Sequence, residues 1–235
     1  LSDGVVQVPA EVPTIQGAID AASNGDTVLV SAGTYYENLN IYLKSIALIG
    51  VDSATTILDG GNNGRILRLN NDRNYGTSLV KGFTIKNGNQ SSGGAIQISN
   101  SYVVLDGLQI IDNYSGSDGG GLSVLGNAGG EVLVENCLFI SNTSPGGGAI
   151  FSKGGIVKKF INQCIFIQNS GSGSVFKADH GDSTIFTNSI FYDNDGTEIF
   201  IERVDETTPE IYVGIQYSLT DFEFDSMYVS TGSTL

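Results

Sequence analysis

The chain has 235 residues, with 25 Asp and Glu against 11 Lys and Arg, so its formal net charge is −14. This length suits one all-β domain, and the negative charge predicts no binding to nucleic acid, anionic membranes or polyanionic glycans, because each would be repelled unless a cation intervened. No apolar run approaches the ~18 residues that a spanning helix needs, so we expect no membrane insertion. His180 is the one histidine, which excludes a zinc site built from several histidines.

The first forty residues differ in kind from the rest of the chain. In the stretch VPTIQGAIDAAS, Thr14 suits a helix N-cap, and Ile15, Ala18, Ile19 and Ala22 follow at helical spacing. We therefore expect a short amphipathic helix over 12–23. Because the open end of a repeat protein needs covering, this helix is predicted to cap the fold.

Beyond residue 24 the sequence repeats. Apolar bursts begin at Gly82, Gly107, Asn136, Gln163 and Asn188, at successive intervals of 25, 29, 27 and 25 residues. Each unit holds short strand-like runs between glycine or asparagine turns. This period of about 26 residues predicts a right-handed parallel β-helix of about seven or eight coils over 24–235, within one domain of 1–235. A continuation into further domains of a longer secreted protein is left open.

Like residues fall at like positions of successive units. Stacked coils lie about 4.8 Å apart, so residues of one column can pair along the axis of the fold. We expect two structural ladders, an amide ladder and an aromatic one: Asn113, Asn142, Asn169 and Asn194, and Phe139, Phe166 and Phe191. Cys137 and Cys164 also share a column, and their parallel Cβ vectors predict two buried thiols without a disulfide.

Residues 5–60 resemble the amino-terminal part of bacterial proteins of the pectin-lyase-like right-handed β-helix superfamily. The coils after them carry the GGAI and FxxN phrases of the chlamydial polymorphic membrane proteins, at 93–96, 147–150, 139–142, 166–169 and 191–194. The resemblance implies a β-helix that is secreted or attached to the cell surface. The glycines of GGAI are predicted to end a loop and turn tightly into a strand.

The resemblance also implies enzyme signatures, and none of them is complete here. The arginine and clustered aspartates of pectate lyases, the GHG and RIK phrases of polygalacturonases and the paired-Asp phrases of pectin methylesterases are not all present. We therefore expect no catalytic residues.

Two polar clusters are weighed as sites. KADHGD brings together Lys177, Asp179, His180 and Asp182, which suits either general acid–base chemistry or, as we favour, a solvated turn. DGGNNGR begins at Asp59, a candidate Ca²⁺ ligand, although a chain-reversing turn is the favoured interpretation. Calcium is the one cofactor considered.

A third feature concerns the strand that opens each coil. Alternation predicts an inward column of Ile96, Leu122, Ile150, Val175 and Ile199. The residue after each of these then faces outward, which gives an outward column of Gln97, Ser123, Phe151, Phe176 and Phe200. Three exposed rings would form a platform for sugar rings or for another protein. A register shift, or covering loops, would bury them instead.

Three functions compete at this stage. The first is a non-catalytic extracellular module that binds a cell-surface glycan or protein, or associates with itself through its carboxy-terminal coils. There Leu138, Ile165 and Ile190 also face outward, where earlier coils have Thr84 and Gln109. The alternative is a polysaccharide lyase or glycoside hydrolase of the superfamily, which would rest on fold alone. A third is a structural subunit that stacks end to end.

Overall fold

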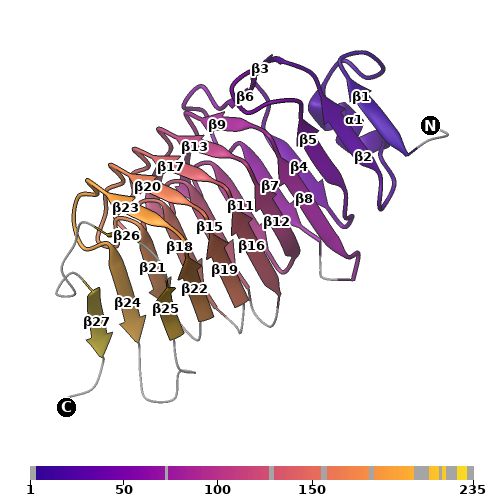
Figure 1. Cartoon of the computed structure of the whole chain (residues 1–235). Helices are drawn as coiled ribbons and strands as arrows, with labels where there is room; N and C mark the ends of the chain where they lie inside the picture. Colours follow the sequence, from indigo (N-terminus) through magenta and orange to yellow (C-terminus); the bar gives the residue numbers. More distant parts are fainter. Residues whose placement is uncertain are drawn as a thin grey trace.

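A computed structural model describes residues 4–71, 74–126, 130–154, 158–179, 183–203, 212–216, 219–220 and 227–231. Side chains are described as far as residue 199 and again at 213–216. The chain forms a right-handed parallel β-helix, a rod with the amino terminus at one end and the carboxy terminus at the other (Figure 1). The predicted fold class is confirmed.

Three parallel sheets run along the rod, and all of their described strand pairs are parallel. Sheet A holds β1 (Val5–Val8), β2 (Thr27–Val30), β5 (Ala47–Gly50), β8 (Thr77–Lys81), β12 (Tyr102–Asp106), β16 (Glu131–Glu135), β19 (Lys158–Asn162), β22 (Ser183–Thr187) and β25 (Tyr212–Gln216). Sheet B holds β3 (Gly33–Tyr35), β6 (Thr56–Asp59), β9 (Thr84–Lys86), β13 (Gln109–Ile111), β17 (Leu138–Ile140), β20 (Ile165–Ile167), β23 (Ile190–Tyr192) and β26 (Leu219–Thr220). Sheet C holds β4 (Leu39–Tyr42), β7 (Leu67–Asn70), β11 (Ile96–Ser99), β15 (Leu122–Leu125), β18 (Ile150–Lys153), β21 (Phe176–Asp179), β24 (Ile199–Arg203) and β27 (Met227–Thr231).

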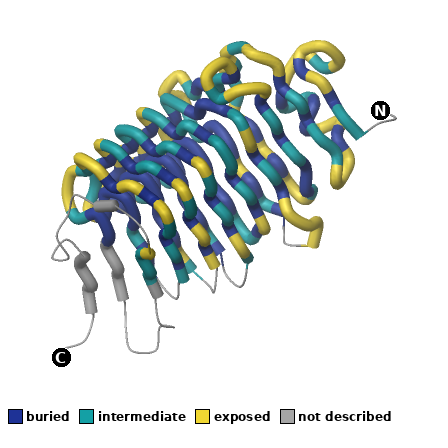
Figure 2. Tube along the Cα trace, in the orientation of Figure 1, coloured by how far each residue is buried: buried dark blue, intermediate teal, exposed yellow. Residues whose placement is uncertain are grey.

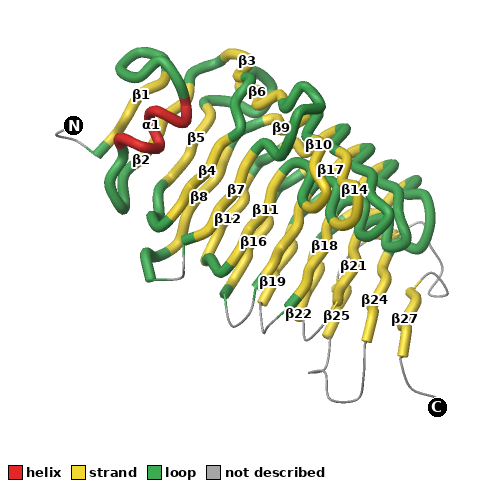
Figure 3. The backbone as a smooth tube through the Cα atoms, turned by 180° about the vertical axis from the view of Figure 1, so that it is seen from behind, coloured by secondary structure: helices red, strands yellow, loops and turns green. Residues whose placement is uncertain are grey.

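Each coil passes through sheet A, then sheet B, then a loop, and then sheet C. In two coils the loop itself contains a strand, and β10 (Asn89–Ser92) pairs with β14 (Tyr114–Asp118) to form a small fourth sheet (Figure 3). Sheets A and B meet at tight corners where the backbone takes positive φ, for example at Gly107 and Asn136. Asparagine and glycine tolerate this conformation, which explains why they recur there.

The core is a set of apolar columns inside the rod. Alternation along each strand sends every second side chain inward, so β8 and β12 show the pattern of buried residues between more exposed ones. Figure 2 shows the buried positions continuing from coil to coil. The predicted aromatic ladder lies in this interior: Phe139 and Phe166 stack with ring centroids 5.0 Å apart, and Phe166 and Phe191 stack at 5.3 Å.

The helix α1 (Ile15–Ala21) packs against strands of the first coil, including β1 and β4, through its buried residues Ile15, Ala18 and Ile19. It is shorter than the expected 12–23. The side chain of Thr14 accepts a hydrogen bond from the Gly17 amide, as an N-cap does. Glu37, from the segment between β3 and β4, accepts two more hydrogen bonds from the amides of Ile15 and Gln16, both 2.9 Å long.

The glycines of the repeated phrase sit where a side chain would not fit. Gly93 has a φ of 65°, and a Cβ on Gly94 would lie 2.2 Å from the carbonyl oxygen of Tyr114. A Cβ on Gly147 would lie 2.2 Å from the carbonyl oxygen of Ile150. These positions bear out the structural role predicted for the GGAI phrase.

Candidate functional site

The predicted platform of three outward phenylalanines is not formed, so this prediction was wrong. Phe176 is fully buried, and it pairs with Ile150 in the inward column of sheet C. Phe151 lies in the neighbouring outward column, in register with Ser123 and Lys177, but it is only 2% exposed. Phe200 pairs with Lys177 through its backbone, and its side chain lies outside the described residues.

Two physical causes explain the error. Ile150 follows the ladder residue Asn142 by eight residues, whereas Phe176 follows Asn169 by seven, so the register of sheet C shifts by one residue between these coils. The glycine-rich loops in between have no side-chain pattern that reveals this shift in the sequence. In addition, the loops fold over the first outward position of sheet C. A Cβ on Gly93, for instance, would lie 3.2 Å from the Cβ atoms of both Gln97 and Ser123.

The four asparagines form a continuous hydrogen-bonded row between sheet B and the loops. The Nδ2 of Asn113 donates to Oδ1 of Asn142 at 2.9 Å, Asn142 donates to Asn169 at 3.0 Å, and Asn169 donates to Asn194 at 3.1 Å. Each Nδ2 also donates to a carbonyl oxygen of the preceding coil, as Asn142 does to Ile110. Asn142 and Asn169 are fully buried, so the row satisfies backbone groups and presents nothing to a ligand.

The two cysteines are free and buried, as predicted. The Cys137 thiol donates to the carbonyl oxygen of Glu135 at 3.0 Å, and the Cys164 thiol donates to that of Asn162 at 3.4 Å. Burial first, and then the adjacent Cys164 thiol, raise the pKa of Cys137 well above its ordinary value. A protonated, enclosed thiol is a poor nucleophile, so neither cysteine is a catalytic candidate.

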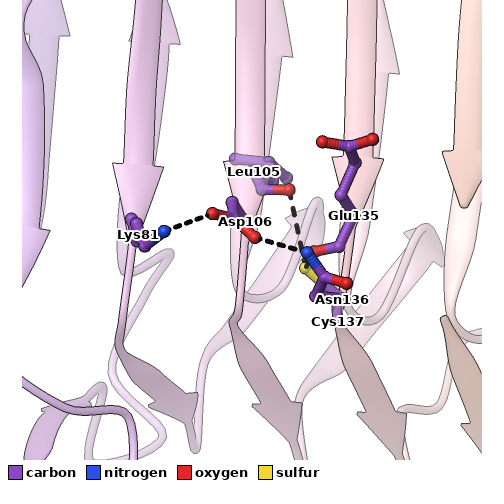
Figure 4. A network of polar contacts seen from close by, with 6 residues as sticks. All are labelled: Lys81, Leu105, Asp106, Glu135, Asn136 and Cys137. Atoms are coloured by element: carbon purple, nitrogen blue, oxygen red, sulfur yellow. Dashed lines mark hydrogen bonds and ion pairs between the residues drawn. The ribbon is translucent and has the colours of Figure 1, made fainter. Parts of the chain in front are cut away.

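A polar network lies beside Cys137 at the corner between sheets A and B (Figure 4). Asp106 Oδ2 lies 2.6 Å from Lys81 Nζ, and its Oδ1 accepts a hydrogen bond from Asn136 Nδ2 at 2.8 Å. Burial alone would raise the pKa of Asp106, but the hydrogen bond from Asn136 and the charge of Lys81 outweigh it, and the pKa is lowered. The network links three coils and holds the corner together.

Asp59, the candidate calcium ligand, has protein partners for both carboxylate oxygens. Its Oδ1 accepts hydrogen bonds from the Gly61 amide at 3.0 Å and from Asn87 Nδ2 at 2.9 Å, while Oδ2 lies 3.6 Å from Lys86 Nζ. These contacts are those of a turn that reverses the chain. Among the residues that the structure describes, no group of three or more His, Cys, Asp or Glu is placed to hold a metal ion.

Only part of the KADHGD cluster can be placed, because His180 and Asp182 lie outside the described residues. Asp179 is the last residue of β21 and is 7% exposed, and its carboxylate lies 2.8 Å from Lys153 Nζ on the adjacent strand. Lys177 is on the same outer face, two residues earlier. The described part of the cluster therefore combines one carboxylate with two cations.

A groove lies on the outer face of sheet C, at its amino-terminal end. Two cavities of about 500 and 250 Å³ share Arg68 in their walls, and we call them together the Arg68 groove. The larger is lined by Asn38, Leu39, Asn40, Asn63, Gly64, Arg65, Arg68 and Gln90, and the smaller by Arg68, Asn70, Ser99, Asn100, Leu125 and Gly126. The lining is thus rich in amides and holds two guanidinium groups.

Strand geometry explains why Arg68 projects into this groove. β7 alternates, with Leu67 and Leu69 buried in the core and Arg68 exposed on the outer face. The side chain of Arg68 forms no ion pair or hydrogen bond with any residue that the structure describes. Arg65 is held differently, because its Nε donates to the carbonyl oxygen of Gly93 at 3.0 Å and a terminal nitrogen donates to that of Ser92.

The groove is electropositive within an acidic chain. No carboxylate lines it among the described residues. Burial first, and then the nearby charge of Arg68, lower the pKa of Arg65, yet a guanidinium stays protonated in proteins. From β7 to β21 the outward positions of this face carry Arg68, Lys153 and Lys177 against Asp179, on a chain that carries −14, whereas β24 adds Glu202 in register with Asp179.

A second outward column continues the groove along the rod. Strand pairing puts six residues in one row: Tyr42, Asn70, Ser99, Leu125, Lys153 and Asp179. Tyr42 at one end is 54% exposed, and beyond Asp179 the strand pairing continues to Glu202. The outward placement of Arg68 has a signal in the sequence, because Arg68 stands between two leucines of one strand.

No described helix is long and apolar enough to span a membrane. No family model matches the chain, and no curated protein matches it. The resemblance to the chlamydial polymorphic membrane proteins therefore stays a prediction.

Solved structures similar to the chain include pectin methylesterases. One, a variant in complex with a hexasaccharide, has a TM-score of 0.53 and 11% identity over 97% of this chain and 92% of its own. The enzyme from Aspergillus niger has a TM-score of 0.54 and 17% identity over 99% and 91%. PemA from Erwinia chrysanthemi has a TM-score of 0.54 and 12% identity over 97% and 93%. At these identities the likeness shows a shared fold, the parallel β-helix.

Proposed function

We propose that the protein is a carbohydrate-active β-helix that binds an extended acidic polysaccharide along the outer face of sheet C, beginning in the Arg68 groove. The observation that carries this proposal is the cation Arg68, exposed in a groove without a described carboxylate, on a chain of charge −14. An acidic ligand would otherwise be repelled by such a chain. The proposal includes an extracellular location, where such polymers occur.

The lining has the chemistry that sugar acids require. A guanidinium binds a carboxylate through two parallel hydrogen bonds, and the amides of Asn40, Asn63 and Gln90 offer both donors and acceptors to hydroxyl groups. Tyr42 adds an exposed ring beside this region, since it pairs with Asn70 of the smaller cavity. A mostly polar floor with one aromatic ring suits a hydrated polymer.

A second candidate function is catalysis on the same polymer. The similar solved structures are enzymes, which supports the polysaccharide-enzyme alternative better than the non-catalytic module. The specific observation here is Asp179, a carboxylate in the row that extends the groove, 2.8 Å from Lys153. Four strand spacings separate it from β7, about 19 Å at ~4.8 Å each, so one bound chain could reach both places.

Binding is tested with polygalacturonate as the probe, by affinity electrophoresis and calorimetry, against dextran as a neutral polymer. We expect Arg68→Gln to weaken binding about 10- to 100-fold, since a hydrogen bond to a charged group contributes about 1.5–3 kcal/mol. Arg68→Lys should retain only part of the wild-type affinity, because lysine cannot form the bidentate hydrogen bonds of a guanidinium. The matched control is Lys158→Gln, which removes one exposed cation from sheet A and should leave binding unchanged.

Equal binding of the two polymers, or an equal loss in Arg68→Gln and Lys158→Gln, would reject the groove. Catalysis is measured separately, as unsaturated product, new reducing ends and methanol from methyl-esterified polymer, with and without Ca²⁺. Product formation that is lost in Asp179→Asn would establish the second candidate. Binding without any of the three products would reject it and leave a carbohydrate-binding protein.

A further inference from the structure

The outer face of sheet B changes character along the rod. In β6 and β9 its outward positions include the paired charges Asp59 and Lys86. From β13 to β23 the outward positions carry no charge, and most are large and apolar: Gln109, Ile111, Leu138, Ile140, Ile165, Ile167, Ile190 and Tyr192. We call these eight positions the sheet B face.

Side chains on the sheet B face remain accessible. Ile190 is 38% exposed and Tyr192 is 58% exposed, and the other six are partly exposed. The inward neighbours in the same strands, such as Phe139 and Phe166, are completely buried, so the register is unambiguous. Among the described residues, this part of sheet B is therefore a mostly apolar, accessible strip, and at its amino-terminal end Gln109 donates a hydrogen bond to Ser53 at 3.3 Å.

The two edges of the sheet B face differ. The edge next to the asparagine ladder carries the exposed carboxylates Asp112 and Asp193, at its two ends. The edge next to sheet A carries the uncharged amides Asn136, Gln163 and Asn188. One edge thus carries carboxylate acceptors. On the other edge Asn136 and Asn188 each donate one hydrogen bond within the chain, to Asp106 and Asn162, and each amide nitrogen has a second N–H.

We propose that the sheet B face binds a second copy of this chain, with the two rods side by side and parallel, related by a two-fold axis along the rod. This operation brings the acidic edge of one copy against the amide edge of the other, and it sets each coil beside its equivalent. The coils of both rods have the same spacing, so the rows of side chains interlock along the whole strip. The other face-to-face arrangement, with antiparallel rods, would set Asp112 against Asp193 of the copy and is disfavoured by their repulsion.

Charge also favours this face over the other two. A copy approaching sheet A would bury charged residues such as Glu131 and Lys158, and one approaching sheet C would bury Arg68 and Lys153. Removing charges from water is costly, whereas the sheet B face contains none. Chains of charge −14 repel one another at long range, so an uncharged apolar strip is the surface where they can meet.

The area of the sheet B face determines how strong the dimer is expected to be. Three-residue strands are about 10 Å long, and four of them about 4.8 Å apart span roughly 15 Å, which gives an area of about 150 Å². Stable pairs bury about 800 Å² per partner, so the dimer is expected to be weak and reversible. Added salt should strengthen it by screening the repulsion between the two chains.

Sedimentation velocity of the full chain, up to about 1 mM, tests the proposal. We expect the sedimentation coefficient to rise with concentration, more at high salt. Ile140→Thr with Ile167→Thr should weaken association at least tenfold, since threonine keeps the β-branch but removes apolar surface. The matched control, Leu133→Thr with Ile185→Thr, changes outward apolar residues of sheet A and should leave association unchanged. A chain that stays monomeric throughout, an equal effect of both pairs, or association that salt abolishes would overturn the proposal.

Cross-linking tests the geometry. Asn136→Cys with Ser141→Cys places thiols on both edges of one coil, and a short bifunctional thiol reagent should join two copies through them. A mixture of two single variants, Ser141→Cys and Gln168→Cys, places thiols where the antiparallel arrangement would bring them together and keeps Asp112 and Asp193, so we expect little cross-linking. All of these positions have φ between 53° and 54°, so the second pair carries the same backbone strain as the first. Preferential cross-linking of the second pair would overturn the parallel arrangement.

Discussion

Asn142 lies in the middle of the asparagine ladder, and its replacement by leucine removes hydrogen bonds while nearly preserving volume. Its Oδ1 accepts from the backbone amide of Asn113 at 3.3 Å and from Nδ2 of Asn113 at 2.9 Å, and its Nδ2 donates to the carbonyl of Ile110 at 2.8 Å. Leucine would leave these three buried groups unpaired. At about 1–3 kcal/mol for each, the free energy of unfolding should fall by at least about 3 kcal/mol.

Urea denaturation followed by circular dichroism measures this loss, with the denaturant slope compared between variants. A suitable control is Asn63→Leu, because Asn63 is exposed and its side chain forms no hydrogen bond with the described residues; its effect should stay within about 0.5 kcal/mol. Hydrogen exchange adds a local measurement, since contacts in a solenoid are made between neighbouring coils and protection should fall first around β13 and β17. A loss below about 1 kcal/mol for Asn142→Leu would refute the role assigned to the ladder.

Three further predictions concern the thiols, the acid response and the helix cap. Cys137 and Cys164 should resist a thiol reagent in the native protein and both react after unfolding without reductant; a disulfide in the mass spectrum would contradict the parallel stacking. The pKa of Asp59 is lowered, because hydrogen bonds from Asn87 and the Gly61 amide and the charge of Lys86 outweigh the opposing effect of burial. Its stabilising contribution is therefore complete above the unfolded pKa of about 3.9 and is lost as the pH falls through the lower folded value, so the melting temperature of Asp59→Asn should depend less on pH below about 4 than that of the wild type. An unchanged acid profile would show that Asp59 contributes nothing. Glu37→Gln should lower the free energy of unfolding by about 0.5–2 kcal/mol, since a carboxylate that accepts from two amides at a helix start is lost; a variant as stable as the wild type in urea would show that the cap is dispensable.

The repeat spacing was enough to predict the fold and its interior rows. Asn142, Asn169 and Phe166 occupy positions set by the corner at the end of sheet B, where the turn length is constant from coil to coil. A fixed interval between like residues is visible in any sequence. The β-helix, the amide row and the stacked rings therefore followed from arithmetic alone.

The candidate site did not follow in the same way. The loops before sheet C vary in length and are built largely of glycine and serine, so the register of Phe176 could not be counted across them. Alternation also failed for Phe151, because a covering loop buries an outward position just as the core buries an inward one. Arg68 was recognisable as an outward residue, but the neighbouring lining from 38–40, 63–65 and 90 meets only through stacking of coils far apart in sequence.

The row from Tyr42 to Asp179 would set the spacing of the contacts that a bound polymer makes along the rod. Its residues are held by backbone pairing at one fixed interval of about 4.8 Å, while the loops beside it change length from coil to coil without altering that interval. A ligand lying along the rod therefore contacts side chains at constant intervals. Replacing one residue changes the chemistry at one position, and adding a coil lengthens the row by one position. The preferred length of a bound chain and the chemical pattern it matches can therefore be altered independently.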